Sequence, residues 1–446
     1  MRLRKTITTI VATAILLAGW QLFAVIANQP ELIPSLPRLV RTLCEWLVSG
    51  SFYQSVGATI LRGVLGMSIS FVCAIGMAGL FARFEWVYEL FRPLLAIMRS
   101  IPVISFILLA LIFLNPESIP LMIAFLTMFP LLTENLTRGI LDLRPGLSIM
   151  ARQFHIRRSN VLFQIIYPQL KPFLYSGLAS AAGFGWRAII MGEVLSQCAF
   201  GIGSEMKRAQ NFIAVPELLA WTIVAVFISF FFDKGISKVA DITPKISFAN
   251  EDQTIPTPTL SVLDTKDISY QYGIQHFSHS FQKGIIYGIS APSGKGKTTL
   301  LNLIGGILLP TEGEIHPTRH FGIATIFQQP QLLPHLTAEE NIILPLSSFL
   351  TEEKARRIAQ KHLQEMEMEP FGNRYPKELS YGQQQRIAIA RALAYPSPLL
   401  LMDEPFASLD FLTRGELQTQ LLAIQRKLPR TIVLVTHQLE EALLLG

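Results

Sequence analysis

Charged side chains and cysteine are both scarce in this chain of 446 residues. Asp, Glu, Lys and Arg make up 16% of it, whereas soluble proteins hold roughly 25%. Since 50% of the residues are hydrophobic, the composition excludes a disordered or fibrous chain and argues against an ordinary soluble enzyme. The three cysteines, Cys44, Cys73 and Cys198, match no metal-binding spacing, and an odd number forms no closed disulfide framework. We interpret them as small apolar residues.

Basic residues are concentrated in one half of the chain. The first 245 residues contain 21 Lys and Arg and 12 Asp and Glu, a net charge of +9, whereas residues 246–446 contain 17 and 20, a net charge of −3. A nucleic-acid-binding protein would gather its basic residues on a solvated face. Here they stand between long apolar runs, as in the cytoplasmic loops of membrane proteins. We therefore expect a lipid membrane, and no nucleic acid, as the partner of this half.

Six apolar stretches predict an all-α transmembrane helix bundle of about six spans over residues 1–242. A helix needs about 20 mostly apolar residues to cross a bilayer. The stretches are residues 7–27, 56–81, 90–114, 119–136, 173–197 and 215–232. In the third, Ile101-Pro102 predicts a break, because proline interrupts or kinks a helix. The first is longer than a signal-peptide core and lacks a clean cleavage site, so we interpret it as an uncleaved anchor.

The basic loops predict the orientation of these spans. Arg2, Arg4 and Lys5 place the amino terminus inside. Four predicted spans separate the amino terminus from residues 138–158, so these residues lie on the same, inner side of the membrane. They contain five arginines and one acidic residue, as expected of an inner loop. Arg187 and Glu193 are charged residues within a predicted span. Two interpretations of them stay open: bonding between helices, or lining of a solute path.

The composition changes after the membrane half. Residues 243–260 hold three prolines and many polar residues without an apolar period, which predicts a linker. Beyond it, residues 261–446 alternate short apolar, often β-branched runs with polar helical stretches. Strands that alternate with helices predict a mainly parallel α/β domain.

The motif Ala291-Pro-Ser-Gly-Lys-Gly-Lys-Thr-Thr299 predicts a phosphate-binding loop (P-loop). It follows an apolar run and opens an apolar helix, so that backbone N–H groups at the helix start would face phosphates. Lys297 would reach the β- and γ-phosphates, and the Thr298 hydroxyl would bind Mg²⁺. If position 291, glycine in the consensus, needs positive φ, Ala291 costs on the order of 1–2 kcal/mol. The candidate nucleotide-binding residues are Ser293, Gly294, Gly296, Lys297, Thr298 and Thr299.

Two carboxylates end a second apolar run, Leu399-Leu-Leu-Met-Asp403-Glu404. Asp403 would share the Mg²⁺ ion with Thr298, and Glu404 would act as general base on the attacking water. Taken alone, an apolar run before two carboxylates fits an ordinary strand end as well as it fits a catalytic site. Downstream of the P-loop in the same α/β half, it predicts a site that hydrolyses a nucleotide.

From about residue 264 to its end, the chain resembles the ATPases of ABC transporters. The resemblance is carried by Leu379-Ser-Tyr-Gly-Gln383 for the signature, Phe327-Gln328 for the Q-loop, Ser408-Leu-Asp410 for the D-loop and Thr436-His437 for the switch histidine. Tyr272 stands where the family has an adenine-stacking aromatic, although Tyr270 is an alternative. The resemblance implies ATP and Mg²⁺ as cofactors.

The family's geometry implies roles for these residues. Two ATPase domains close head to tail, and each ATP lies between the P-loop of one and the signature of the other. Ser380, Gly382 and Gln383 would then bind the ATP of the partner copy. Gln328 would sense the nucleotide and join Thr298 and Asp403 at the metal. Gln328, Glu404 and His437 are therefore the candidate catalytic residues.

This chain departs from the family's pattern in three places. Tyr381 replaces a signature glycine, so we expect its side chain to point away from ATP. Gln438 replaces the Asp that usually follows the switch histidine. The sequence ends nine residues after His437, where the family usually has further strands, so we expect the domain to be short there. These departures leave open whether the ATPase rate is reduced.

Residues 30–240 resemble the permeases of bacterial ABC importers for sulfonates, taurine, nitrate and thiamine precursors. Residues 34–37, 59–66 and 99–103 carry this resemblance. In the loop after the fourth span, Ile149-Met-Ala151, His155 and Pro168 align with the family's Glu-Ala-Ala, Gly and Pro, although the Glu and Gly are absent. The resemblance implies that this loop forms a short helix that docks on the ATPase near Gln328.

We therefore predict a half-transporter in which a permease (1–242) is fused through a linker (243–260) to an ABC ATP-binding domain (261–446). Two copies would form an ATP-driven importer of a small solute in the bacterial cytoplasmic membrane, with the ATPase in the cytoplasm and an external solute-binding protein. One alternative is an exporter half-transporter, which would carry a longer membrane domain. Another is a degenerate ATPase that acts as a regulated membrane interaction module.

Overall fold

A computed structural model describes residues 2–240, 243–253, 262–271, 273–292, 294–316, 323–407, 409, 411–427 and 429–445. The chain forms two units. The first comprises Met1–Leu143 and Leu170–Ile242, and the second comprises Arg144–Gln169 and Thr243–Gly446. The loop after the fourth predicted span therefore belongs to the same unit as the α/β domain.

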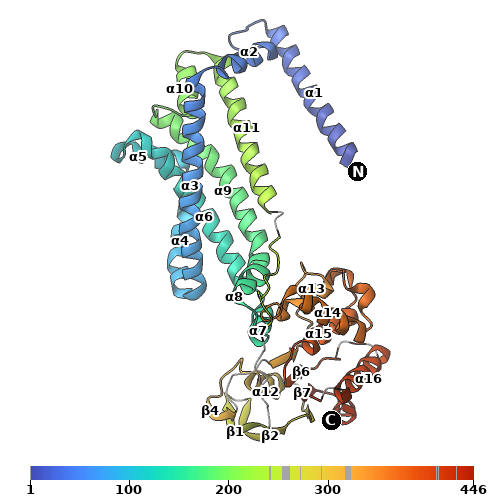
Figure 1. Ribbon diagram of the computed structural model, residues 1–446. Helices are drawn as coiled ribbons and strands as arrows, with labels where there is room; N and C mark the ends of the chain where they lie inside the picture. Colours follow the sequence, from blue (N-terminus) through green and yellow to red (C-terminus); the bar gives the residue numbers. More distant parts are fainter. Residues whose placement is uncertain are drawn as a thin grey trace. The chain divides into compact units, whose positions relative to one another are not determined.

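The first unit is helical, as its apolar stretches predict (Figure 1). Its helices are α1 (Arg2–Ala27), α2 (Leu36–Trp46), α3 (Gly50–Arg83), α4 (Glu85–Ser100), α5 (Val103–Phe113), η1 (Pro116–Ser118), α6 (Ile119–Leu141), most of α9 (Tyr167–Ser196), α10 (Ile202–Asn211) and α11 (Val215–Ala240). Pro37 and Pro120 are the second residues of α2 and α6, where a missing backbone N–H removes no helical hydrogen bond.

By length and composition, the described residues contain four helical stretches able to cross a membrane. They are Gly50–Arg83, Pro116–Leu141, Arg158–Ser196 and Val215–Lys238. Helices α4 and α5 count as a fifth if they form one span, but they are bent by 95° at the break that Ile101-Pro102 predicts. In α1 the apolar part, Val11–Ala27, is shorter than a span. The expected count of about six is therefore not confirmed.

Small side chains let α3 and α6 approach closely; the two helices run side by side in Figure 1. The buried positions of α3 recur every three or four residues, which places them on one helix face. They are Ser55, Thr59, Gly63, Gly66, Ser70, Ala74, Ala78 and Phe81. A Cβ on Gly66 would lie 2.6 Å from Cβ of Ala124 in α6, so only glycine fits there.

Glu193 joins three helices of this unit. Its carboxylate is fully buried in α9 and accepts hydrogen bonds from the Thr59 hydroxyl (3.0 Å) and the Gly203 backbone N–H (3.0 Å). Arg62 of α3 lies 2.8 Å away and pairs with it. A buried carboxylate is tolerated when it is paired in this way. Glu193 therefore bonds between helices, which is the first of the two interpretations that the sequence leaves open. Arg187 is exposed, so this bonding does not extend to it.

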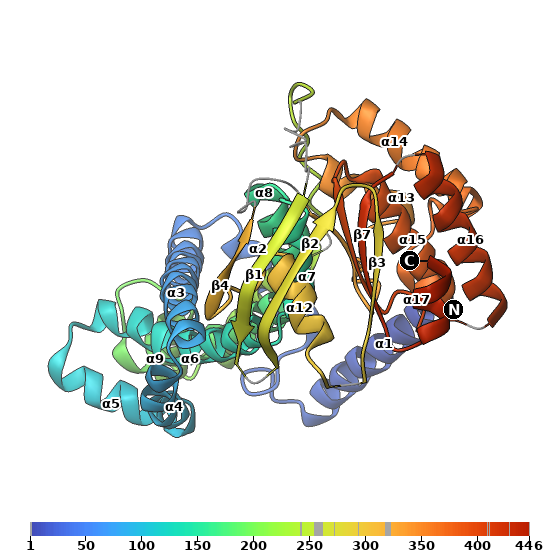
Figure 2. The same ribbon diagram turned by 90° about the horizontal axis from the view of Figure 1, so that it is seen from below.

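The described residues of the second unit form two sheets. Its strands are β1 (Val262–Tyr270), β2 (Ile274–Gln282), β3 (Ile286–Ser290), β4 (Glu312–His316), β5 (Ile323–Ile326), β6 (Leu399–Asp403) and β7 (Thr431–Thr436). The first sheet, in the order β2-β1-β4, is antiparallel, and Figure 2 shows its three strands side by side. The second, in the order β3-β7-β6-β5, is parallel throughout. The second sheet is thus the parallel sheet that the alternation of strands and helices predicts for residues 261–446.

Helices cover the parallel sheet because its central strands, β7 and β6, are apolar on both faces. All six residues of β7 are buried, as are four of the five in β6. The helices of this unit are α7 (Pro145–Gln153), α8 (Arg158–Asn160), η2 (Val161–Ile166), α12 (Lys297–Ile304), α13 (Ala338–Leu346), α14 (Glu352–Glu365), η3 (Glu369–Phe371), η4 (Pro376–Glu378), α15 (Tyr381–Ala394), α16 (Phe411–Lys427) and α17 (Leu439–Leu445).

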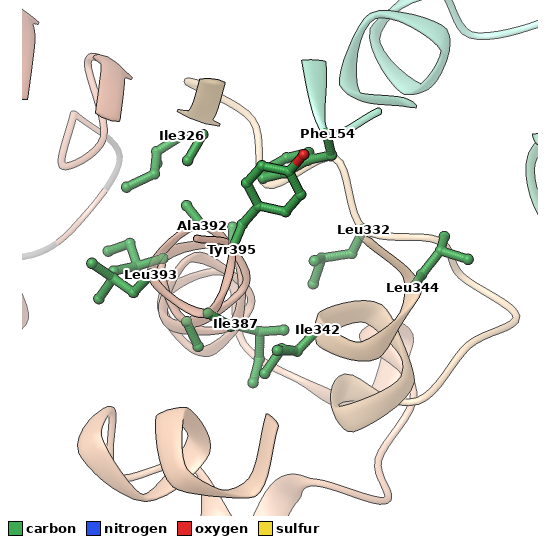
Figure 3. Close-up of a cluster of buried hydrophobic side chains, with 14 of the residues drawn as sticks. Phe154, Ile326, Leu332, Ile342, Leu344, Ile387, Ala392, Leu393 and Tyr395 are labelled. Carbon is green, nitrogen blue, oxygen red and sulfur yellow. The ribbon is translucent and has the colours of Figure 1, made fainter. Parts of the chain in front are cut away.

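The loop after the fourth predicted span packs into the core of the α/β unit. The Phe154 ring meets the Tyr395 ring edge to face, with centroids 5.3 Å apart, among Leu332, Ala392 and neighbouring apolar side chains (Figure 3). The short helix expected in this loop is α7, which begins at Pro145. A Cβ on Gly146 would lie 2.7 Å from the side chain of Gln331, three residues beyond Gln328. The helix therefore docks beside the Q-loop.

Candidate nucleotide-binding site

The P-loop connects β3 to α12 and contains two residues that need glycine. Gly294 and Gly296 both have φ +81°, in the left-handed region that glycine adopts without strain. A Cβ on Gly296 would also lie 2.9 Å from the carbonyl oxygen of Gly273, at the turn between β1 and β2. Ala291 is not among the residues with positive φ. The strain considered for this alanine is therefore absent.

Lys297 lies inside the P-loop. Its side chain is 8% exposed, and Nζ donates hydrogen bonds to the carbonyl oxygens of Ala291 (2.7 Å) and Pro292 (3.2 Å). Nζ is also 4.0 Å from Oε1 of Glu404. The ammonium group and the free N–H groups at the start of α12 both favour an anion at this place, so the loop fits a nucleotide phosphate.

Thr298 and Asp403 form the candidate metal position. The Thr298 hydroxyl donates to Oδ1 of Asp403 at 3.2 Å, which joins the start of α12 to the end of β6. Burial raises the pKa of Asp403, as does the Glu404 carboxylate, while the Thr298 hydrogen bond and Lys297 oppose the shift. The described residues hold no group of three or more His, Cys, Asp and Glu that could bind a metal by themselves. A hydroxyl and one carboxylate suit Mg²⁺, which completes its shell with phosphate and water.

Three candidate catalytic residues meet at Glu404. The Gln328 amide Nε2 donates to Oε2 of Glu404 at 3.2 Å, and Nδ1 of His437 lies 3.5 Å from the same oxygen. Glu404 itself has φ +45° and its backbone N–H donates to the carbonyl oxygen of Val435. A glutamate in the left-handed region is strained, and such strain is common at functional sites. The parallel pairing of β6 with β7 brings Glu404 and His437 to the same sheet edge.

The signature residues form the start of α15. Ser380 is the N-cap: its hydroxyl accepts from the Gln383 N–H, and the Gln383 side chain accepts from the Ser380 N–H. As an acceptor, the Ser380 hydroxyl keeps its own proton free to donate. Together with the unpaired N–H groups of the first turn, including that of Gly382, it could bind a phosphate.

Several candidate residues lie outside the described part of the chain. They are Tyr272, Ser293, and Ser408 and Asp410 of the D-loop; Leu409 between them is buried. Thr299 follows Thr298 in α12 and is half-buried. The structure thus brings together Lys297, Thr298, Gln328, Asp403, Glu404 and His437.

Arg391, which holds the Q-loop, is not among the candidate residues that the sequence motifs identify. Arg391 is buried in α15 and donates to the carbonyl oxygens of Pro330 and Gln331, at 2.8 Å each. Its guanidinium lies 5.6 Å from the centroid of the Phe154 ring. Burial lowers the pKa of Arg391 to about 10, so it remains charged at neutral pH. The position of this arginine within the apolar run of residues 387–394 was the signal that could have identified the anchor.

Comparison with known proteins matches both halves of the chain. Residues 274–407 match the family model described as ABC transporter, and residues 68–233 match the one described as binding-protein-dependent transport system inner membrane component. The spermidine/putrescine import ATP-binding protein PotA of Nitrosomonas europaea is 36% identical over 201 residues, which cover 42% of this chain and 56% of that protein. The chain thus spans little more than half the length of that relative.

Two further proteins are similar to part of the chain. The nitrate transport protein NasD of Klebsiella oxytoca is 38% identical over 187 residues, which cover 39% of this chain and 70% of NasD. Among solved structures, the dimeric ATP-binding cassette MJ0796 in a post-hydrolysis state, bound to ADP and Pi, shares 34% sequence identity with this chain. The match covers 41% of this chain and 90% of the MJ0796 chain, with a TM-score of 0.38.

Proposed function

Because this chain belongs to the ABC transporter family and joins an importer-type permease to an ATPase domain, we propose that it hydrolyses ATP to import a small solute across the bacterial cytoplasmic membrane. One observation carries the proposal: Lys297, the Thr298–Asp403 pair and the Gln328–Glu404–His437 group share one site, on a chain that also holds permease helices. The proposal places the ATPase domain in the cytoplasm.

Each residue of the site has a chemical task in this proposal. Lys297 neutralises phosphate charge, and Thr298 with Asp403 holds Mg²⁺, which would shield the charge that develops on the phosphates. Glu404 accepts the proton of the attacking water. Its pairing with Gln328 and His437 orients the carboxylate. His437 would stabilise charge on the γ-phosphate once that group lies beside it.

Import is favoured over export by the family model that matches the permease half and by the names of the relatives. The matching family model is described as binding-protein-dependent, and the relatives named above take part in spermidine/putrescine import and nitrate transport. An external solute-binding protein is therefore the proposed second partner. The named solutes include a polycation and an oxyanion, so they share no chemistry that would identify the solute of this chain.

A homodimer would complete the two ATP-binding sites of the proposed transporter. The start of α15 offers a hydroxyl and free N–H groups to a phosphate, and two-fold pairing is the commonest way in which one chain supplies both halves of a site. Each ATP would lie between the P-loop of one copy and the signature of its partner.

Glu404→Gln tests the proposed activity. The amide cannot accept the water proton, so we expect ATP turnover to fall by about 10²-fold or more while Mg-ATP still binds. Solute uptake into vesicles containing the purified chain should cease with it. Wild-type protein without measurable turnover would favour the degenerate module, and solute movement out of the cytoplasmic side would favour the exporter.

A further inference from the structure

Tyr381 makes a contact that the family's glycine could not make. It follows the N-cap Ser380 at the first position of α15 and is 39% exposed. Its phenol O–H donates to the backbone carbonyl oxygen of Gln328 at 2.8 Å. The side chain expected to point away from ATP thus reaches the Q-loop of its own cassette.

The same helix holds the Q-loop at a second point. Arg391, ten residues after Tyr381 and nearly three turns along α15, donates to the carbonyl oxygens of Pro330 and Gln331. Hydrogen bonds from a buried charged donor are strong ones. Because both ends of the segment 328–331 are attached to α15, this loop follows any movement of the helix.

Gln328 extends this attachment to the catalytic carboxylate. Its backbone carbonyl accepts from Tyr381, and its side-chain amide donates to Oε2 of Glu404 at 3.2 Å. A shift at the start of α15 therefore changes the position of the amide that orients Glu404.

We propose that Tyr381 is a positioning residue that couples the two ATP sites of the paired cassettes. The inference rests on the proposed function, because the start of α15 would contact the ATP bound to the partner copy. When that phosphate binds at Ser380, the phenol O–H···O bond carries the displacement to Gln328 and so to Glu404 in the other site. ATP at one site thereby prepares hydrolysis at the second.

Tyr381→Phe removes only the hydroxyl and is the decisive variant. The readout is the ATP concentration dependence of turnover by the full chain in lipid nanodiscs. We expect a Hill coefficient above 1 in the wild type and a value close to 1 in the variant. Turnover at saturating ATP should fall about two- to tenfold, the range of one hydrogen bond. The affinity of the P-loop for Mg-ATP, measured with Glu404→Gln in both proteins, should not change.

Two further variants separate the hydroxyl from the rest of the side chain. Tyr381→Gly, which also lacks the phenol, should lower the Hill coefficient as Tyr381→Phe does. Tyr375→Phe removes the hydroxyl of another tyrosine that is 39% exposed and should leave turnover and Hill coefficient as in the wild type.

The outcomes are distinct. The inference is overturned if Tyr381→Phe has the same Hill coefficient as the wild type, or if the wild type itself has a coefficient of 1. It is also overturned if Tyr375→Phe lowers the Hill coefficient as much as Tyr381→Phe does. Absence of ATP turnover in the wild type overturns the proposed function and this inference with it. A reduced coefficient at unchanged Mg-ATP affinity supports coupling, because a merely structural role of Tyr381 would not change cooperativity alone.

Discussion

At the scale of single residues, backbone conformation decides where the P-loop needs glycine. Ala291 replaces a glycine at a position without positive φ. Gly294 and Gly296 have the same φ, +81°, but different surroundings. Nothing lies within 4 Å of a Cβ added to Gly294, whereas one added to Gly296 meets backbone atoms of Gly273. These three positions allow two predictions.

Gly294→Ala and Gly296→Ala form a matched pair. Both alanines would bear left-handed strain of about 1–2 kcal/mol, but only the second must also displace the turn at Gly273. We expect Gly296→Ala to weaken Mg-ATP binding and lower the melting temperature more than Gly294→Ala. Titration of a fluorescent ATP analogue and thermal unfolding measure the two effects. Equal losses in both variants would contradict this explanation.

Restoring the consensus glycine should not help. Since Ala291 bears no positive φ, Ala291→Gly only increases the freedom of the unfolded chain, and we expect a loss of stability of about 0.4–1 kcal/mol. ATP turnover should stay within twofold of the wild type. A severalfold rise in turnover would show instead that this alanine limits the site.

At the scale of elements, the start of the predicted linker ties the loop after the fourth predicted span to the α/β domain. Asn160 is buried, accepts from the Ser247 N–H, and donates to the Ser247 carbonyl and the Ser347 hydroxyl. The linker N–H of Ala249 donates to the carbonyl of Ser347. One amide side chain thus holds three chain segments together: α8, the linker and the end of α13.

Asn160→Ala should loosen this junction. The buried Ser347 hydroxyl would lose a hydrogen-bond partner, which costs about 1–3 kcal/mol, and the exposed Ser247 would lose both of its hydrogen bonds to Asn160. We expect faster amide hydrogen exchange in residues 244–253 and less solute moved per ATP hydrolysed. Ser348→Ala is a suitable control, because among the described residues its hydroxyl accepts from the exposed Arg157 N–H alone. If both variants exchange and transport alike, Asn160 is not the anchor.

At the scale of the whole molecule, the fusion makes stoichiometry testable. If each ATP lies between two copies, Lys297→Ala removes a P-loop and Ser380→Arg blocks a signature. All copies also carry Glu404→Gln, so that bound ATP is not hydrolysed. We expect a dimer with this substitution alone to trap two ATP molecules. We expect a dimer to trap none when both of its copies carry Lys297→Ala, or when both carry Ser380→Arg. A mixed pair of Lys297→Ala and Ser380→Arg copies should trap one, since one intact P-loop faces one intact signature. Trapping by separated single copies would contradict the shared site.

The contiguous motifs were predictable from the sequence because their chemistry is local. A glycine-rich loop before a helix start predicts phosphate binding wherever it occurs, and two carboxylates after an apolar strand predict a position at the sheet edge. Long apolar runs likewise predicted the helices of the membrane half. The angle at Ile101-Pro102 was not predictable: proline indicates a break, but packing decides that the bend is 95°.

Tertiary structure alone decided which distant groups meet. Tyr381 lies 53 residues from Gln328, and Asn160 lies 187 residues from Ser347, so no local pattern could pair them. Tyr381 looked like a defect in a phosphate-binding signature until the fold placed its hydroxyl on the Q-loop. A side chain's reach is set by its own chemistry, which the sequence states, but its partner is set by the packing of whole elements.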